Sequence, residues 1–318
     1  MTTYELFSDR LIEQVLRKKS HVVVGLDPVY EKLPSILKRG AGDSLKDICR
    51  AIFDFNRTLI DATYDIVPAI KPQVAFYERY GVEGMKAFEK TVRYGKKKGL
   101  IVIEDAKRND IGSTATAYSD GHLGRVRLSS RNIAVFDLDA ITVNPFLGSD
   151  GILPFLFDVR EYRKGIFILV KTSNPSSREL QDLYIVSGNK KQKVYEYLSQ
   201  LVNKWGKDTI GEYGYSSVGA VVGATFPNDA KLLRKLMPKT YFLVPGFGAQ
   251  GGQASDIVHC FNKDGLGAII AASRSINYAY KNNKKYGSKH YGSAARDAVL
   301  RMNFEVNKAL EKAGILTW

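Results

Sequence analysis

The sequence predicts an α/β fold, a (β/α)8 TIM barrel with an extra N-terminal helix and a long connection after the fifth strand. Short β-branched runs recur along the chain, and each is followed by a longer segment of helical periodicity. Eight such runs occur in 318 residues, whereas about 250 residues is typical of this barrel. No Gly/Ser-rich or Pro-rich linker divides the chain, so we expect a single domain over residues 1–318.

The predicted strands are continuous apolar runs, which is typical of parallel strands covered by helices on both faces. A doubly wound open sheet is the alternative fold. The eight strands are expected at His21–Leu26, Ile66–Ile70, Leu100–Ile103, Ala140–Val143, Ile166–Val170, Val218–Val222, Tyr241–Val244 and Ala268–Ala272.

Amphipathic stretches between these runs predict helices that return the chain by right-handed crossovers. The first twenty residues carry charge in every turn, which predicts a further helix and excludes a signal peptide. The connection Asn174–Ser217 holds much of the surplus length, and its role stays open. The other helices are expected at Ser44–Thr63, Glu83–Lys98, Ser113–Arg127, Lys191–Trp205, Pro227–Leu236, Gln253–Asn262 and Ala294–Ala313.

The composition excludes wholesale disorder, a fibrous repeat and a disulfide-rich miniprotein, with 44% hydrophobic and 25% charged residues. The longest apolar runs, such as Ile166–Val170, fall far short of the roughly 20 residues needed to cross a bilayer. Cys49 and Cys260 are too few for a disulfide framework or a structural zinc site. We therefore expect a cytoplasmic protein with no membrane association.

The net charge of +14 allows three interpretations. Lysine and arginine are scattered, with short runs that suit solvated helix faces and loop tips. No RRM, KH, zinc-finger or basic-zipper signature supports nucleic-acid binding. A positive field also attracts an anionic small substrate. Charge alone does not choose among these interpretations.

Ionisable or turn-forming residues follow six of the predicted strands, at the ends where this fold forms its active sites. Taken singly, an aspartate there is usually a helix cap, and a lysine between apolar residues can reach the surface. Together, the six strand ends are expected to converge on one opening of the barrel, the barrel mouth. The six ends are Gly25–Pro28, Ile70–Pro72, Glu104–Gly112, Val170–Pro175, Pro245–Gly252 and Ser273–Arg274.

The third strand end carries the most informative cluster. Asp105 and Lys107 are two residues apart, so in an extended strand they project from the same face. Asp110 follows just ahead of a predicted helix start, where capping is the alternative role. With Lys71 from the neighbouring strand, the mouth would hold two ammonium and two carboxylate groups. Such charges are costly to desolvate unless paired, which favours a functional role.

The segment Asp105–Thr114, DAKRNDIGST, resembles the active-site signature of the orotidine 5′-phosphate decarboxylase family. The fifth and seventh strand ends are similar to those of its longer, type 2 subgroup, and the resemblance spans nearly the whole chain. The Asp-x-Lys-x-x-Asp core is shared with ketogulonate-phosphate decarboxylases and hexulose-phosphate synthases. Lys71, the Ile-Gly-x-Thr continuation and the lack of a metal-binding acid pattern favour the orotidylate enzyme.

The resemblance implies that orotidine 5′-monophosphate loses CO2 to give UMP in de novo pyrimidine biosynthesis, with no metal and no organic cofactor. The carbanion left at C6 is poorly delocalised, so an enzyme without an electron sink must stabilise it electrostatically and then protonate it. Lys107 suits both tasks. Asp105 is expected against the substrate carboxylate, with Lys71 and Asp110 fixing the array.

The resemblance also implies a homodimer with shared active sites, because the residues matching Asp110, Ile111 and Thr114 reach the site of the other subunit. The remaining substrate contacts carry over by position. Asp27 matches the ligand of the ribose hydroxyls. Ser173 matches the residue that binds the pyrimidine edge, a role that neighbouring Thr172 can share.

The phosphate group is expected near the seventh and eighth strand ends. Gln250 matches a phosphate-loop glutamine, and Arg274 matches the phosphate-binding arginine, whose fork of donors suits a dianion. The glycines of the Pro245–Gly252 loop favour a lid, with a flexible tight turn as the alternative. Many family members have glycine where this chain has Ser273.

Two other functions remain open. One is a Mg²⁺-dependent decarboxylase or aldolase of the same superfamily that acts on a sugar phosphate, which a chelator would inactivate. The other is a nucleic-acid-binding protein on a barrel scaffold, which would show a steep dependence of binding on salt.

Overall fold

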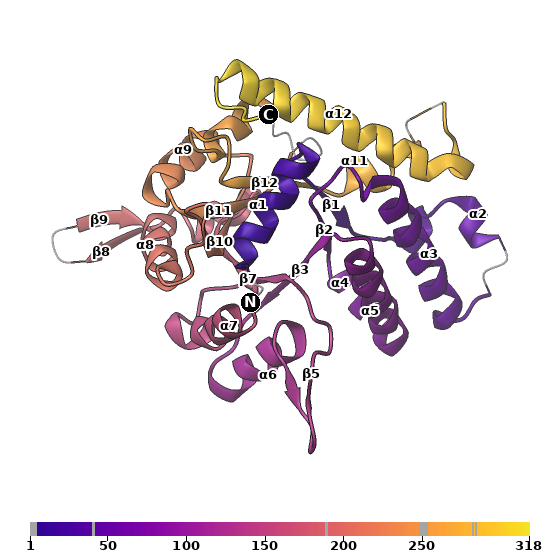
Figure 1. The fold of residues 1–318 in the computed structure, drawn as a ribbon, viewed down its shortest axis with the longest axis horizontal. Coiled ribbons are helices and arrows are strands. Elements are labelled where there is room, and N and C mark those ends of the chain that lie inside the picture. The colour runs from indigo at the N-terminus through magenta and orange to yellow at the C-terminus, as the bar shows by residue number, and fades with distance from the viewer. Residues whose placement is uncertain (1–4, 40–41, 188–189, 248–253, 282, 284) are drawn as a thin grey trace.

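Eight parallel strands close into a barrel in the order β1-β12-β11-β10-β7-β6-β3-β2 (Figure 1). The computed structural model describes residues 5–39, 42–187, 190–247, 254–281, 283 and 285–318. The barrel strands are β1 (Val22–Leu26), β2 (Ala69–Pro72), β3 (Ile101–Arg108), β6 (Ala140–Val143), β7 (Gly165–Lys171), β10 (Ser216–Val222), β11 (Thr240–Pro245) and β12 (Ala268–Ala272).

The predicted barrel is confirmed, and the alternative of an open sheet is wrong. Closure is direct, because β1 pairs in parallel with β12 on one side and with β2 on the other. Every predicted strand overlaps an observed one, although β2 begins only at Ala69 and β3 continues to Arg108. The extra length of β3 carries the residues of the Asp105–Lys107 cluster beyond the buried part of the strand.

Helices surround the barrel, and α12 runs along one side of it (Figure 1). The short α2 (Ser35–Lys38), α4 (Ala75–Glu78), α10 (Ala254–Ile257) and α11 (Arg274–Asn277) lie in connections. The longer helices are α1 (Phe7–Lys18), α3 (Leu45–Thr63), α5 (Gly81–Lys97), α6 (Gly112–His122), α7 (Ser149–Glu161), α8 (Val194–Gly206), α9 (Pro227–Leu236) and α12 (Tyr291–Lys312). None in the described part of the chain is long and apolar enough to cross a membrane.

Three predicted helices include residues that form other elements. The helix expected to reach Arg127 ends at His122, since the chain then forms the hairpin of β4 (Val126–Arg127) and β5 (Asn132–Ile133). The helix expected from Lys191 begins at Val194, because the preceding residues belong to a strand. The stretch expected to run to Asn262 contains α10 followed by a separate 3₁₀ turn.

Helix α7 was not predicted, although it buries Ile152, Phe155, Leu156 and Val159. Pro154 lies inside it, and a proline is a strong signal against a helix interior. The apolar positions recur at intervals of three and four residues, and this periodicity was the available signal for the helix.

The long connection after the fifth strand forms its own small structure. It contains a 3₁₀ turn at Pro175–Glu179, the antiparallel hairpin of β8 (Tyr184–Ser187) and β9 (Lys190–Lys193), and then α8. In Figure 1 the hairpin projects away from the barrel. The segment that precedes the hairpin returns to the barrel mouth, where Gln181 lines the central cavity.

The predicted N-terminal helix is confirmed and lies across one end of the barrel (Figure 1). Phe7, Leu11, Ile12 and Val15 of α1 are buried in one cluster with inward-facing strand residues, including Phe167. The rings of Phe7 and Phe167 meet edge to face at 5.9 Å. The helix therefore closes the barrel interior at the end opposite the strand ends that carry the polar residues.

We expect Leu11→Ala to lower the free energy of unfolding by about 2–5 kcal/mol, because Leu11 is fully buried and the truncation leaves a cavity. Glu13→Ala, on the exposed face of the same helix, is the matched control and should stay within about 0.5 kcal/mol of the parent. Urea denaturation of the three proteins measures both effects. Equal stability of the Leu11→Ala variant and the parent would mean that α1 does not close the core.

Candidate active site

A cavity of about 720 Å³ opens at the carboxyl ends of the barrel strands, in the size range of small-molecule sites. Residues on or directly after all eight strands line it. Leu169, Val221, Leu243 and Pro245 give part of the cavity an apolar wall, and charged side chains gather on the other part. The six polar strand ends predicted from the sequence therefore do converge.

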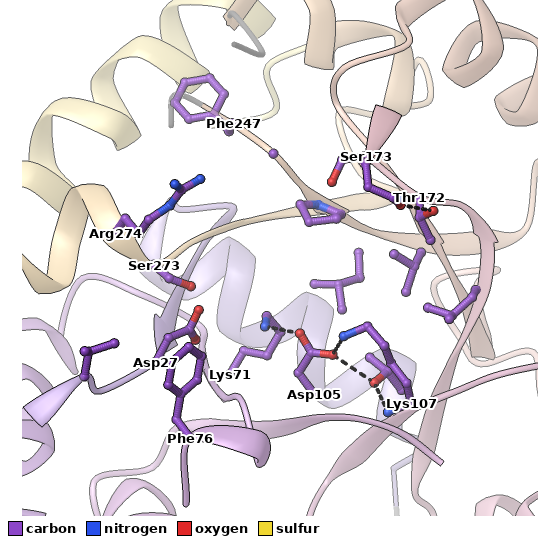
Figure 2. A pocket seen from close by; sticks show the side chains of 18 of the residues that line it. Asp27, Lys71, Phe76, Asp105, Lys107, Thr172, Ser173, Phe247, Ser273 and Arg274 are labelled. Atoms are coloured by element: carbon purple, nitrogen blue, oxygen red, sulfur yellow. Dashed lines mark hydrogen bonds and ion pairs between the residues drawn. The ribbon is translucent and has the colours of Figure 1, made fainter. Parts of the chain in front are cut away.

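Asp105 lies between two lysines in this cavity (Figure 2). Its Oδ2 accepts a hydrogen bond from Lys71 Nζ at 2.6 Å, and its Oδ1 accepts one from Lys107 Nζ at 2.5 Å. Lys71 reaches this carboxylate from β2 and is buried, so the alternative of a lysine that extends to the surface is wrong. The sequence prediction that Lys71, Asp105 and Lys107 meet is confirmed.

Lys71 and Asp105 stabilise each other's charged forms, and Lys107 favours the charged form of Asp105. Burial alone would raise the pKa of Asp105, but the ammonium groups of Lys71 and Lys107 outweigh it and hold that pKa below its usual value. Burial likewise would lower the pKa of Lys71, and the carboxylates of Asp105 and Asp27 raise it instead. The cavity thus presents an ionised carboxylate flanked by ammonium groups at neutral pH.

The backbone at Lys107 departs from a regular strand. Its φ is +51°, in the left-handed region that side chains other than glycine rarely adopt. Such a conformation costs about 1–2 kcal/mol and persists only where neighbouring contacts enforce it. The sequence argument assumed a regular extended strand, so it was right that Asp105 and Lys107 meet but wrong about the backbone that brings them together.

Asp27 faces the same cavity from the end of β1, beside Ser273 (Figure 2). Burial raises the pKa of Asp27, while Lys71 and a hydrogen bond from Ser273 oppose that rise. Its Oδ1 is buried and has no hydrogen-bond partner among the described residues. A buried acceptor without a partner is costly, and this oxygen is available to accept a hydrogen bond in the cavity.

Arg274 lines the cavity on the side away from Lys107, and Phe247 lies on the same side as Arg274 (Figure 2). The segment that carries Arg274 is fixed to β1, because Asn277 Nδ2 donates to the carbonyl oxygens of Gly25 and Ser273 at 2.6 Å. Gly25 lets the two strand ends approach closely, since a Cβ at that position would lie 2.0 Å from Ser273 Oγ and would displace that side chain. Asn277 thus links the ends of β1 and β12.

The connection after β7 fixes the Thr172–Ser173 segment. Gln181 Oε1 accepts from the Thr172 amide at 2.9 Å, and Gln181 Nε2 donates to the Thr172 hydroxyl at 2.8 Å. That hydroxyl donates in turn to Asn174 Oδ1 at 2.7 Å. Thr172 is therefore engaged within the chain, whereas no hydrogen bond of the Ser173 hydroxyl is seen among the described residues. Of the two candidates, Ser173 is better placed to bind a ligand.

A buried ion pair anchors the same connection to the barrel. Lys171, the last residue of β7, is fully buried and pairs with Asp182, and its Nζ also lies 3.6 Å from Asp229 Oδ2. The ring of Phe226 lies 4.6 Å from the same ammonium group. Sequence reasoning missed Gln181 and Asp182, because nothing in the spacing of the connection shows which of its polar residues return to the mouth.

Asp110, Ile111 and Thr114 do not line the cavity of their own chain. Asp110 Oδ1 accepts a hydrogen bond from the amide of Ile111. No side-chain cap of α6 is seen among the described residues, so the helix-capping alternative for Asp110 is not supported. Ile111 is 52% exposed. Gln250 and the glycines at 248, 251 and 252 lie outside the described residues, so their predicted roles stay predictions.

Comparison with known proteins decides the family. The model of the Orotidine 5'-phosphate decarboxylase / HUMPS family matches residues 20–288. The chain belongs to this family. It is 43% identical over 283 residues to the orotidine 5'-phosphate decarboxylase of Caldicellulosiruptor saccharolyticus, covering 87% of this chain and 90% of that protein. The resemblance seen in the sequence is thereby confirmed.

Two further relatives match this chain over nearly their full lengths. The orotidine 5'-phosphate decarboxylase of Clostridium novyi is 41% identical over 303 residues, covering 95% of this chain and 99% of that protein. A solved structure of Leishmania donovani OMP decarboxylase superposes with a TM-score of 0.69 at 29% identity, covering 96% of this chain and 98% of that one. These family members share the length of the chain, in agreement with the longer subgroup.

Proposed function

We propose that this protein decarboxylates orotidine 5′-monophosphate to UMP as a cytoplasmic enzyme of pyrimidine biosynthesis, without a metal or an organic cofactor. The observation that carries the proposal is the Lys71–Asp105–Lys107 array inside the cavity of a chain that belongs to the decarboxylase family. An ionised carboxylate between two ammonium groups provides fixed charges on both sides of a bond whose cleavage moves charge.

In the proposed reaction the bond between C6 and the carboxylate carbon breaks, and its electron pair stays on C6 while CO2 leaves. The ammonium of Lys107 lies beside that carbon and stabilises the developing charge. It then donates its proton to C6 and forms UMP, and the neutral amine regains a proton from water. Lys107 is about half exposed in the open cavity, so solvent reaches its Nζ.

Asp105 is proposed to lie against the substrate carboxylate. The hydrogen bonds from Lys71 and Lys107 keep it ionised and fixed in place. Repulsion between two like charges falls as CO2 departs, which lowers the energy of the transition state relative to that of the bound substrate. Lys71 is a positioning residue in this proposal, because it holds Asp105.

The proposed substrate contacts extend along the cavity from this array. The unpartnered Oδ1 of Asp27 would accept from a ribose hydroxyl, and Ser173 would bind the pyrimidine edge beside the apolar wall. Arg274 would bind the phosphate on the far side. Gln250 is proposed to join Arg274 on the strength of the sequence resemblance alone.

Incubation of the purified protein with orotidine 5′-monophosphate and EDTA tests the function, followed by the change in absorbance as UMP forms. We expect full turnover with the chelator present. Activity on a sugar phosphate that EDTA abolishes would support the Mg²⁺-dependent alternative instead. Retention on RNA or DNA with no turnover of either substrate would support the nucleic-acid-binding alternative.

We further propose that two copies of the chain form a dimer in which Asp110, Ile111 and Thr114 complete the partner's site. A patch of exposed apolar residues lies on α7 and the loop before it. A Cβ at Gly151 of α7 would lie 3.0 Å from the Asp110 carbonyl oxygen, so this helix borders Asp110. Apolar patches of this kind commonly mark protein interfaces. The exposed apolar residues of α7 and the preceding loop are Phe146, Leu147, Leu153 and Phe157, and Ile111 is exposed as well.

We expect Lys107→Ala to keep the fold and the affinity for UMP while kcat falls by at least the ~10²–10⁴-fold typical of losing a proton donor. The alanine removes both the ammonium and the transferable proton without touching the residues proposed to hold ribose and phosphate. Steady-state kinetics and UMP titration measure the two effects. Turnover close to that of the parent would remove Lys107 from the mechanism.

We expect Arg274→Ala to cost about 2–5 kcal/mol in kcat/KM for orotidine 5′-monophosphate, on the scale of truncating one partner of a buried charge pair. Orotidine without its phosphate should hardly be affected. Lys281→Ala is the matched control, because Lys281 is an exposed nearby cation that does not line the cavity. Equal losses for both substrates would show that Arg274 has a structural role only.

The shared site is tested by mixing inactive variants. Lys107→Ala and Asp110→Ala subunits, dissociated and reassociated, should give hybrids with one intact site and one doubly damaged site. About half the dimers in an equal mixture are hybrids, so activity should recover to roughly one quarter of the parent level.

The control for this experiment mixes Lys107→Ala with Asp105→Asn. Both residues belong to the same chain's cavity, so no site in that hybrid is intact and activity should stay lost. If the first mixture stays as inactive as the second, although mass analysis confirms hybrids, Asp110 serves its own subunit.

A further inference from the structure

We propose that Thr142 is a positioning residue of the active site, whose hydroxyl fixes both the Asp105 carboxylate and the backbone on which Lys107 stands. The inference rests on the proposed decarboxylation, and it assigns a role in that reaction to a residue on the neighbouring strand. Thr142 is the third residue of β6, is 1% exposed and lines the cavity.

Strands β3 and β6 do not pair regularly beside the catalytic residues. Glu104 is aligned with Ile141, and the next aligned pair is Arg108 with Val143. Residues 105–107 of β3 therefore lie opposite the single residue Thr142. A bulge of this kind removes backbone acceptors from the ladder and leaves the amides of the longer strand in need of other partners.

The side chain of Thr142 supplies those partners. Its Oγ1 accepts from the amide of Ala106 at 3.0 Å and from the amide of Lys107 at 2.9 Å. The same hydroxyl donates to Asp105 Oδ1 at 3.1 Å. One hydroxyl thus holds the bulge together at the residue whose φ is +51°.

The Thr142 hydroxyl has only one proton, so its other partners determine the group to which it donates. A threonine hydroxyl has one proton to donate and two lone pairs with which to accept. Two backbone amides occupy the lone pairs, so the proton points to Asp105 and that oxygen must act as an acceptor. The arrangement excludes a proton on Oδ1 of Asp105 and fixes the position of that oxygen.

Other charged groups also act on Asp105. Lys71 from β2 and Lys107 from β3 favour its ionised form. Asp27, from the end of β1, is a second carboxylate that faces the cavity, and it repels Asp105. The lysines therefore keep Asp105 ionised even without Thr142. Thr142 therefore acts on position and not on charge. Without its hydroxyl, the amides of Ala106 and Lys107 and the Oδ1 of Asp105 lose their hydrogen-bond partner on β6.

Thr142→Val tests the inference, because valine has the shape of threonine but lacks the hydroxyl. We expect kcat to fall by about 10²-fold, the usual scale for a misplacement of about 1 Å at a reacting centre. The affinity for UMP should stay within about threefold, because UMP has no carboxylate to meet Asp105 and its proposed ribose and phosphate ligands lie elsewhere. Hydrogen exchange at the amides of residues 106 and 107 should quicken.

Thr142→Ser keeps the hydroxyl and should retain kcat within about fivefold of the parent with slow exchange at both amides. Thr63→Val is the matched control, since Thr63 is fully buried in α3 and its hydroxyl bonds only to Leu59 O among the described residues. That variant should lose stability without losing turnover. If Thr142→Val does not fold, Thr142→Cys, with a weakly hydrogen-bonding thiol, should lie between the serine variant and an inactive enzyme.

Turnover of Thr142→Val, or of the cysteine variant in its place, at the parent level would overturn the inference. A serine variant as slow as the valine variant would also overturn it, as would equal losses of kcat and of UMP affinity. Failure of the proposed function is a separate outcome, because the parent protein itself would then show no turnover of orotidine 5′-monophosphate.

Discussion

The ion array of Lys71, Asp105 and Lys107 is the feature on which the rest of the site depends. A carboxylate withdrawn from water loses several kcal/mol of solvation, which two close ammonium groups restore only in good geometry. The distances of 2.6 and 2.5 Å provide that geometry from two adjacent strands. An array of this kind contributes little net stability, so its presence in a cavity is explained by chemistry rather than by folding.

The barrel provides the rigidity that this array requires. Lys71 lies on β2, and Asp105 and Lys107 lie on β3. Thr142 lies on β6, so three neighbouring strands of the barrel position the charged groups. The regular ladder ends at Glu104, and the bulge beyond it brings the side chains of Asp105 and Lys107 together. The strain at Lys107 is thus local, and the surrounding hydrogen bonds maintain it.

The sequence predicted most of this architecture because its signals are local. Buried parallel strands are apolar runs, and the spacing of Asp105 and Lys107 already places them on one strand end. Thr142 could not be recognised, since a threonine near the end of a buried strand is common and its three partners lie 35–37 residues away in sequence. Helix α7 was missed because Pro154 obscured its periodicity, and Gln181 because a long connection can return to the barrel at any of its residues.

Exchange of the C6 hydrogen of UMP for deuterium tests most directly whether this array stabilises a carbanion. Removal of that proton gives the same carbanion as loss of CO2, so the groups that favour one step must favour the other. With UMP bound in deuterated water and the exchange followed by NMR, the account predicts faster exchange than in free UMP, and loss of that exchange in Lys107→Ala. Exchange that is no faster on the enzyme, or that is undiminished in Lys107→Ala, would contradict it.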